Sequence, residues 1–160
     1  MKMKLLSAVL LFASLSVGCG EEEESIDSEG CEHLQKGPST PVTATASATG
    51  APAVSNDHRR YDISLIDVTG GKGGSVSFAV SEAIDYILFT NADVPVTVKD
   101  ANGQTIAFEE SAKSSTECSD IKGRFTVPLA VGTQTFTFGP TTATSVSLVI
   151  EEAGGHDHED

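Results

Sequence analysis

Alternation of apolar and polar side chains with a period of two runs through the middle of this chain and constrains its fold most strongly. Successive side chains of an extended strand point to opposite faces, so the pattern predicts half-buried strands. No stretch shows a convincing 3.6-residue repeat, and helices are therefore not expected. The predicted strands cover residues 60–68, 76–80, 84–90, 94–98, 104–109, 124–129, 134–138 and 145–151.

Turn-forming residues separate these segments. Asp100-Ala101-Asn102-Gly103 is a hairpin signal, because Asn-Gly readily adopts positive φ. Residues 110–122 read as a polar loop, and residues 42–48 fit either an edge strand or a linker. About eight short strands of this kind predict an all-β fold, an antiparallel, jelly-roll-like β-sandwich over residues 41–152.

The N-terminus has the pattern of a secretory signal. Lys2 and Lys4 precede an uncharged run from Leu5 to Val17. A helix of that length would span roughly 20 Å, too short for a hydrocarbon core of about 30 Å. Residues 1–18 are therefore predicted to be a cleaved signal peptide.

The end of this segment, Leu15-Ser16-Val17-Gly18-Cys19, resembles the lipobox of bacterial lipoproteins, with Ser16 at the position where that family prefers Leu. The resemblance implies lipidation of Cys19 and acyl chains that hold the chain at a membrane. Gly20 after the cysteine implies the outer membrane by similarity to enteric lipoproteins. An ordinary cleaved signal, with Cys19 incidental, is the alternative.

Acidic residues dominate the segment that begins at Cys19. Residues 19–40, which include Glu21-Glu22-Glu23-Glu24, are predicted to be a flexible, extended tether. The whole chain carries a formal charge of −13. Such a charge argues against binding nucleic acid, whose phosphates would be repelled.

The two remaining cysteines, Cys31 and Cys118, form an even pair. In an exported chain they are predicted to form a disulfide, which would close a loop of about 87 residues and contribute at most about 4–5 kcal/mol. Two free thiols serving as metal ligands are the alternative.

The segment from Leu129 to Phe138 reads strand, turn, strand. It is similar to the corresponding part of jelly-roll domains such as bacterial pre-peptidase C-terminal domains, a similarity that covers residues 76–160. The resemblance implies a non-catalytic accessory sandwich.

The last eight residues, 153–160, form a tail with His156, Asp157 and His158. Imidazoles two positions apart beside a carboxylate can chelate Zn²⁺, Cu²⁺ or Ni²⁺, although a solvated tail is the simpler interpretation. Glu151 and Glu152 could add oxygen ligands, and His33 or His58 could join the tail if the N-terminal segment folds back on the sandwich. Nothing in the sequence places these residues together.

No sequence motif points to catalysis. Residues 70–75 are glycine-rich but lack the order of a phosphate loop, and no Gly-x-Ser-x-Gly elbow occurs. The chain is therefore predicted not to be an enzyme. We expect a membrane-anchored lipoprotein of the cell envelope that presents a binding or structural module to an envelope or protein partner, or else a periplasmic metal-binding lipoprotein that uses the tail.

Overall fold

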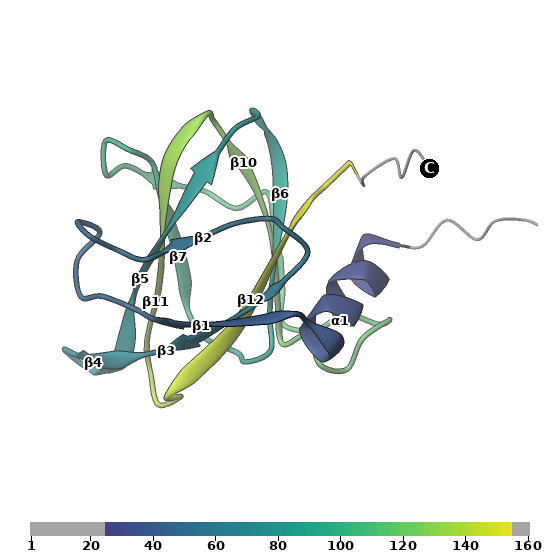
Figure 1. Cartoon of the computed structure of the whole chain (residues 1–160), viewed down its shortest axis with the longest axis horizontal. Helices are drawn as coiled ribbons and strands as arrows, with labels where there is room; N and C mark the ends of the chain where they lie inside the picture. Colours follow the sequence, from purple (N-terminus) through teal and green to yellow (C-terminus); the bar gives the residue numbers. More distant parts are fainter. Residues whose placement is uncertain (1–24, 155–160) are drawn as a thin grey trace, which may run out of the picture.

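Twelve strands in two sheets account for about half of residues 25–154, which are the residues that the computed structural model describes (Figure 1). The predicted all-β sandwich is confirmed. The first sheet, sheet A, has the strand order β1 (Ser39–Thr43), β3 (Arg60–Ser64), β12 (Ser145–Glu152), β6 (Ile84–Thr90), β10 (Gly123–Leu129), β9 (Glu110–Ala112). The second, sheet B, has the order β2 (Ala53–Val54), β5 (Gly71–Val80), β11 (Gly132–Thr141), β7 (Val96–Lys99), β8 (Thr105–Ile106), with β4 (Ile66–Val68) also paired to β5.

Both sheets are mixed rather than antiparallel, which corrects one part of the sequence prediction. Most neighbours are antiparallel, but β1 pairs with β3 and β2 pairs with β5 in parallel. Between β1 and β3 the chain crosses to sheet B, where it forms β2, and then returns to sheet A. This crossover is the long connection that a parallel pair of strands needs. Because a period of two does not encode strand direction, the sequence could not reveal this.

The main hydrophobic core lies between the sheets, and the alternation predicts its members well. The predicted inward-facing residues that are buried there are Tyr61, Ile63, Leu65, Val76, Phe78, Val80, Val127, Leu129, Val146, Leu148 and Ile150. The hairpin at Asp100–Gly103 is also confirmed, since the Gly103 amide donates to the Asp100 carbonyl at 2.9 Å and β7 pairs with β8 beyond it.

Several strand boundaries differ from the prediction, among them the start of β5, which is Gly71 rather than residue 76. Residues 60–68 form two strands in different sheets, β3 and β4, with Leu65 between them. The predicted loop 110–122 begins with the short strand β9. Of residues 42–48, which fit either a strand or a linker, only the first two belong to the edge strand β1, which ends at Thr43.

The outer face of sheet A carries a second, smaller hydrophobic cluster. Its buried members are Leu34, Ile87, Phe89, Cys118, Ile121 and Val149. Strand β6 is therefore buried on both faces, which explains why residues 86–89 read as a continuous apolar run instead of alternating. Because these side chains are apolar, another part of the chain must cover this outer face of sheet A, and a helix does so.

The covering element, α1 (Ile26–Lys36), corrects the described part of the predicted tether over residues 19–40 (Figure 1), and residues 19–24 lie outside the described residues. The helix lies along the outside of sheet A and contacts β12 and β6. Its sequence is too short and too polar to show a strong helical repeat, and the sheet supplies the apolar surface that its own residues lack. The folded domain therefore begins well before residue 41.

Candidate metal centre

Local sequence signals set both ends of α1. The side chain of Ser25 accepts a hydrogen bond from the Ser28 amide, and Asp27 and Glu29 lie in the first turn, where the helix dipole favours acids. Gly37 ends the helix with φ +71°, a conformation that side chains disfavour, and its amide donates to the His33 carbonyl at 2.9 Å.

Gly30 lets α1 approach the sheet closely. A Cβ atom at this position would lie 2.4 Å from ring carbons of Phe89 on β6. Ile26 and Leu34 flank Gly30 at four-residue intervals and pack into the same cluster. The helix therefore has one narrow apolar face, which sets its distance from sheet A.

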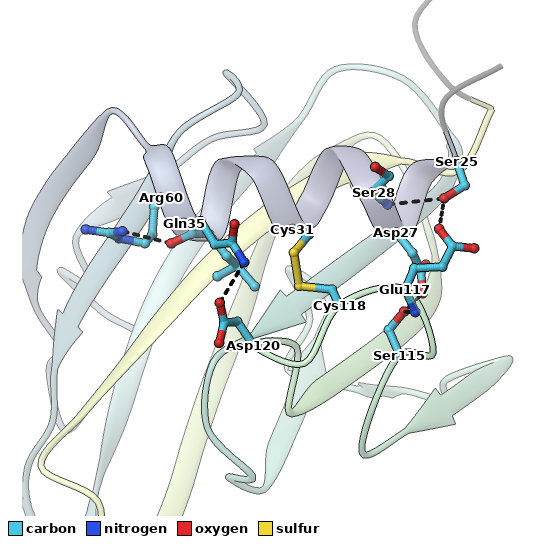
Figure 2. The surroundings of a disulfide bond; sticks show 11 residues. Ser25, Asp27, Ser28, Cys31, Gln35, Arg60, Ser115, Glu117, Cys118 and Asp120 are labelled. Carbon is cyan, nitrogen blue, oxygen red and sulfur yellow. Dashed lines mark hydrogen bonds between the residues drawn. A yellow bond between two sulfur atoms is a disulfide. The ribbon is translucent and has the colours of Figure 1, made fainter. Parts of the chain in front are cut away.

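A disulfide joins α1 to the loop that follows β9, as the sequence predicted (Figure 2). Cys31 and Cys118 have Cα atoms 5.8 Å apart, within the usual range. Cys118 is buried in the second cluster, and Cys31 packs against it. The bond fixes the middle of the helix to the sandwich.

Polar contacts hold both ends of the helix to the same loop and strands (Figure 2). Asp27 accepts from Arg124 Nε at 2.8 Å and from Ser115 Oγ at 2.6 Å. Gln35 Nε2 donates to Asp120 at 2.8 Å, and the Leu34 carbonyl accepts from Arg60 at 2.8 Å. The position of α1 on sheet A is thus fixed at several points.

Two side chains with metal-binding atoms project from α1 one turn apart. Glu29 and His33 are at positions i and i+4, which lie on the same side of a helix. Nδ1 of His33 lies 2.6 Å from Oε1 of Glu151, near the end of β12. Because a carboxylate only accepts, the ring N–H of His33 donates in this contact.

Glu151 is a fully buried carboxylate, with 0% of its side chain exposed. It lies on the outer face of β12, opposite Ile87 in the register with β6, and α1 covers that face. Burying a carboxylate among apolar side chains costs free energy unless a hydrogen bond or a cation compensates. The position of Glu151 therefore indicates a site that is built to face positive charge.

His58 completes the cluster from the loop between β2 and β3. Its φ is +54°, and among the described residues it is the one non-glycine with positive φ. Strained backbone of this kind persists only where the surroundings hold it, and it concentrates at functional sites. His58 Nδ1 lies 3.4 Å from Glu29 Oε1 and 3.7 Å from Glu151 Oε2.

Neighbours on both sides of His58 hold this loop in place. The Tyr61 hydroxyl donates to Asp57 at 3.0 Å, and Asn56 donates to Glu152 at 2.6 Å. Burial acts to raise the pKa of Asp57, but hydrogen bonds from Ser55, Tyr61 and the backbone, together with the charge of Arg59, lower that pKa. These contacts hold the loop that carries His58 against the sandwich.

Together Glu29, His33, His58 and Glu151 each place one ligand atom within 4.8 Å of all the others. A tetrahedral ion with bonds of about 2.0–2.1 Å holds its ligand atoms roughly 3.3–3.4 Å apart. The distances from His58 Nδ1 to Glu29 Oε1 and Glu151 Oε2, 3.4 and 3.7 Å, are close to that spacing. The 2.6 Å contact between His33 Nδ1 and Glu151 Oε1 is a hydrogen bond, which an entering ion would replace with release of the shared proton.

The donor set favours a late first-row divalent cation. Two imidazole nitrogens and two carboxylates are a common environment for Zn²⁺, whereas Ca²⁺ and Mg²⁺ prefer oxygen ligands alone. With both histidines neutral, the two carboxylates match the charge of a divalent ion. The overall charge of −13 also attracts cations to the molecule.

The sequence pattern predicts metal ligands in a different place. His156, Asp157 and His158 lie outside the described residues, as does Cys19. His33 and His58, which no sequence pattern joins, lie with ring centroids 5.2 Å apart. Two sequence signals could have pointed to this site. Ser25 is a helix N-cap residue, which predicts a helix that carries Glu29 and His33. Glu151 is an acid directly after an apolar run, which indicates a carboxylate near the core.

A separate cleft of about 670 Å³ lies beside the paired rings of Phe108 and Phe125. Residues of β7, β9 and β10 line it together with Lys113 and Lys122, and none of them belongs to the four-residue cluster. The cleft is the size of a small-molecule pocket, but it lacks the convergent ligand atoms of the cluster.

No protein-family model matches the chain, and no curated protein is significantly similar to it. Among residues 25–154, no helix is long and apolar enough to cross a membrane. The site therefore stands on its geometry and its chemistry.

Proposed function

We propose that this chain is a lipid-anchored protein of the bacterial cell envelope whose sandwich binds a divalent transition metal, with Zn²⁺ as the reference ion, through Glu29, His33, His58 and Glu151. One observation carries the proposal: the ligand atoms of two histidines and two acids converge within 4.8 Å although they come from three separate segments. The role is binding rather than catalysis, as in a metal buffer or sensor.

The anchor rests on the N-terminal sequence. A basic start, a short apolar run and Gly18-Cys19 support lipidation of Cys19 after export. Several acyl chains make such an anchor stable, whereas one chain alone is marginal. We propose the outer membrane as the location. Expression of the chain with Cys19→Ser tests the anchor, because the protein should lose incorporation of labelled palmitate.

Calorimetric titration with Zn²⁺ tests the metal site. The full chain carrying Cys19→Ser, purified in a mild detergent, keeps one cysteine pair and all four histidines. We expect one ion per chain with submicromolar affinity, and no heat from Ca²⁺ or Mg²⁺. The variant Glu29→Gln/His58→Ala should weaken Zn²⁺ binding at least about 100-fold, since it removes two of the four ligands.

The tail provides a matched control. His156→Ala/His158→Ala also removes two histidines, and it tests the alternative site that the sequence suggested. If the cluster is the metal site, this variant binds Zn²⁺ like the parent chain. If instead the tail variant loses binding and the Glu29/His58 variant keeps it, the tail is the site and the cluster is only a structural polar network.

A further inference from the structure

We infer that the Cys31–Cys118 disulfide controls the affinity of the metal site, so that the oxidised chain binds the ion more tightly and the bound ion in turn protects the disulfide. The inference rests on the proposed function and concerns the regulation of the same site. The reason is that the disulfide and the ion would hold the same helix to the same sandwich.

The ligands divide equally between two parts of the fold. Glu29 and His33 belong to α1, while His58 and Glu151 belong to the sandwich. Cys31 lies between Glu29 and His33 on the helix, and Cys118 lies on the sandwich side. An ion in the site and the disulfide would therefore be two parallel connections across one interface.

The helix depends on these connections because it is weak by itself. It has 11 residues, and isolated helices shorter than about 12–15 residues are marginal in water. Only Gly30 and Leu34 are buried among its residues. Without the disulfide, docking relies on the apolar contacts of Ile26 and Leu34 and on a few polar contacts. These are the contacts of Asp27 and Gln35, the bond from Arg60 to the Leu34 carbonyl, and the contact between His33 and Glu151.

Reduction would therefore lower the fraction of chains that have all four ligands in place. The apparent dissociation constant equals the intrinsic constant divided by the fraction in the binding-competent state. If α1 is docked in about 1–10% of reduced chains, affinity falls by about ten- to a hundredfold. By reciprocity, the ion must disfavour reduction by the same factor.

The chemistry requires a dithiol reductant from the envelope. Its thiolate attacks one sulfur, breaks the Cys31–Cys118 bond and forms a mixed disulfide. Its second thiol then closes a disulfide within the reductant, and the two protons end on the two cysteine thiols. Cys118 is only 3% exposed, so attack is favoured when α1 lifts from the sheet, which is the motion that a bound ion opposes.

The first experiment compares Zn²⁺ affinity with and without the disulfide. In the full-length Cys19→Ser chain in detergent, we expect Cys31→Ser/Cys118→Ser to raise the dissociation constant by about ten- to a hundredfold. Gln35→Ala is the control, because it removes an exposed contact of α1 and leaves the disulfide intact, and it should change affinity less than about threefold. Equal affinity in the oxidised chain and the double variant overturns the inference. Tighter Zn²⁺ binding by the reduced parent chain also overturns it, because the free thiolates of Cys31 and Cys118 would then be ligands.

The second experiment uses only the native disulfide and therefore does not depend on the double variant folding. The release of thiols by a phosphine reductant is timed with and without saturating Zn²⁺. Because attack needs α1 to lift and a bound ion lowers the population of the lifted state, we expect Zn²⁺ to slow release about tenfold or more in the parent chain and not in Glu29→Gln/His58→Ala. An oxidised chain that binds no Zn²⁺ refutes the proposed function, whereas an unchanged reduction rate in a chain that does bind Zn²⁺ refutes only the coupling.

Discussion

Nδ1 of His33 and Oε1 of Glu151 lie 2.6 Å apart although 118 positions separate the two residues in the chain. The contact joins the first helix of the described fold to its last strand. It also lies where a buried carboxylate would otherwise face an apolar surface. The N-terminal segment is therefore part of the folded domain, and its docking creates the candidate metal site.

Replacing the buried carboxylate should destabilise the metal-free protein. Glu151→Gln keeps the shape of the side chain but removes the charge that faces His33, at an expected cost of about 1.5–3 kcal/mol of unfolding free energy. Urea unfolding in the presence of a chelator measures it. Glu109→Gln, at an exposed position, should change stability by less than about 0.5 kcal/mol. Equal effects would mean that the pair contributes nothing to stability.

A methyl group at Gly30 should push α1 away from the sheet. Gly30→Ala gains about 1 kcal/mol of helix propensity, but the new Cβ would meet the Phe89 ring at 2.4 Å. Overpacking costs about 1–3 kcal/mol, so we expect a net loss of stability and a weaker Zn²⁺ affinity. Thermal unfolding and titration measure the two effects. Gly154→Ala, which meets nothing within 4 Å, should be neutral, and a stabilised Gly30→Ala protein would contradict the close packing.

The ion pair at the start of α1 should matter more than an exposed one. Asp27→Asn weakens contacts with Arg124 and Ser115, and because Asp27 and Arg124 are only 17% and 20% exposed, we expect a loss of about 1 kcal/mol. The control is Asp93→Asn, whose partner Lys113 is 82% exposed and whose effect should stay below about 0.5 kcal/mol. Denaturant unfolding compares them, and the same loss from both would argue against a role of Asp27 in docking.

Both tyrosines should titrate late in the folded protein. Burial raises the pKa of Tyr61, and contact with Asp57 adds to the rise. Burial likewise raises the pKa of Tyr86, with a contribution from Glu152. The contribution of the two neutral phenols to stability is thus complete at pH values below their unfolded pKa of about 10. It is lost as the pH rises through their pKa values in the folded state.

Absorbance at 295 nm measures this directly, because the chain has two Tyr and no Trp. The phenolate signal of the folded protein should appear at higher pH than that of the same protein in denaturant. Coincident titration curves would show that neither hydroxyl is held by the fold.

The strands were predictable because their signal is local. Residues such as Val76 and Phe78 alternate with polar neighbours, and that pattern needs no knowledge of the partner strand. The disulfide was also predictable, because Cys31 and Cys118 are the two cysteines that remain once Cys19 is assigned to the predicted signal. Strand direction was not, since β2 and β5 pair in parallel only because of the path that the chain takes between sheets.

The helix and the site were hidden for a different reason. Helix α1 takes much of its stability from the outer face of β6 and β12, so its own residues show little amphipathic pattern. Glu29 and His33 are close in sequence, but His58 and Glu151 reach them only through the docking of α1 on sheet A. No spacing in the sequence carries that information.

The sequence by itself determined that the chain forms a β-sandwich, because alternation is a property of the chain alone, and it predicted the Cys31–Cys118 bond once Cys19 was assigned to the N-terminal signal. The tertiary structure decided which face of that sandwich is covered, and therefore that Glu151 is buried beside two histidines. Burial depends on what packs against a surface, and here the packing element comes from the opposite end of the described chain.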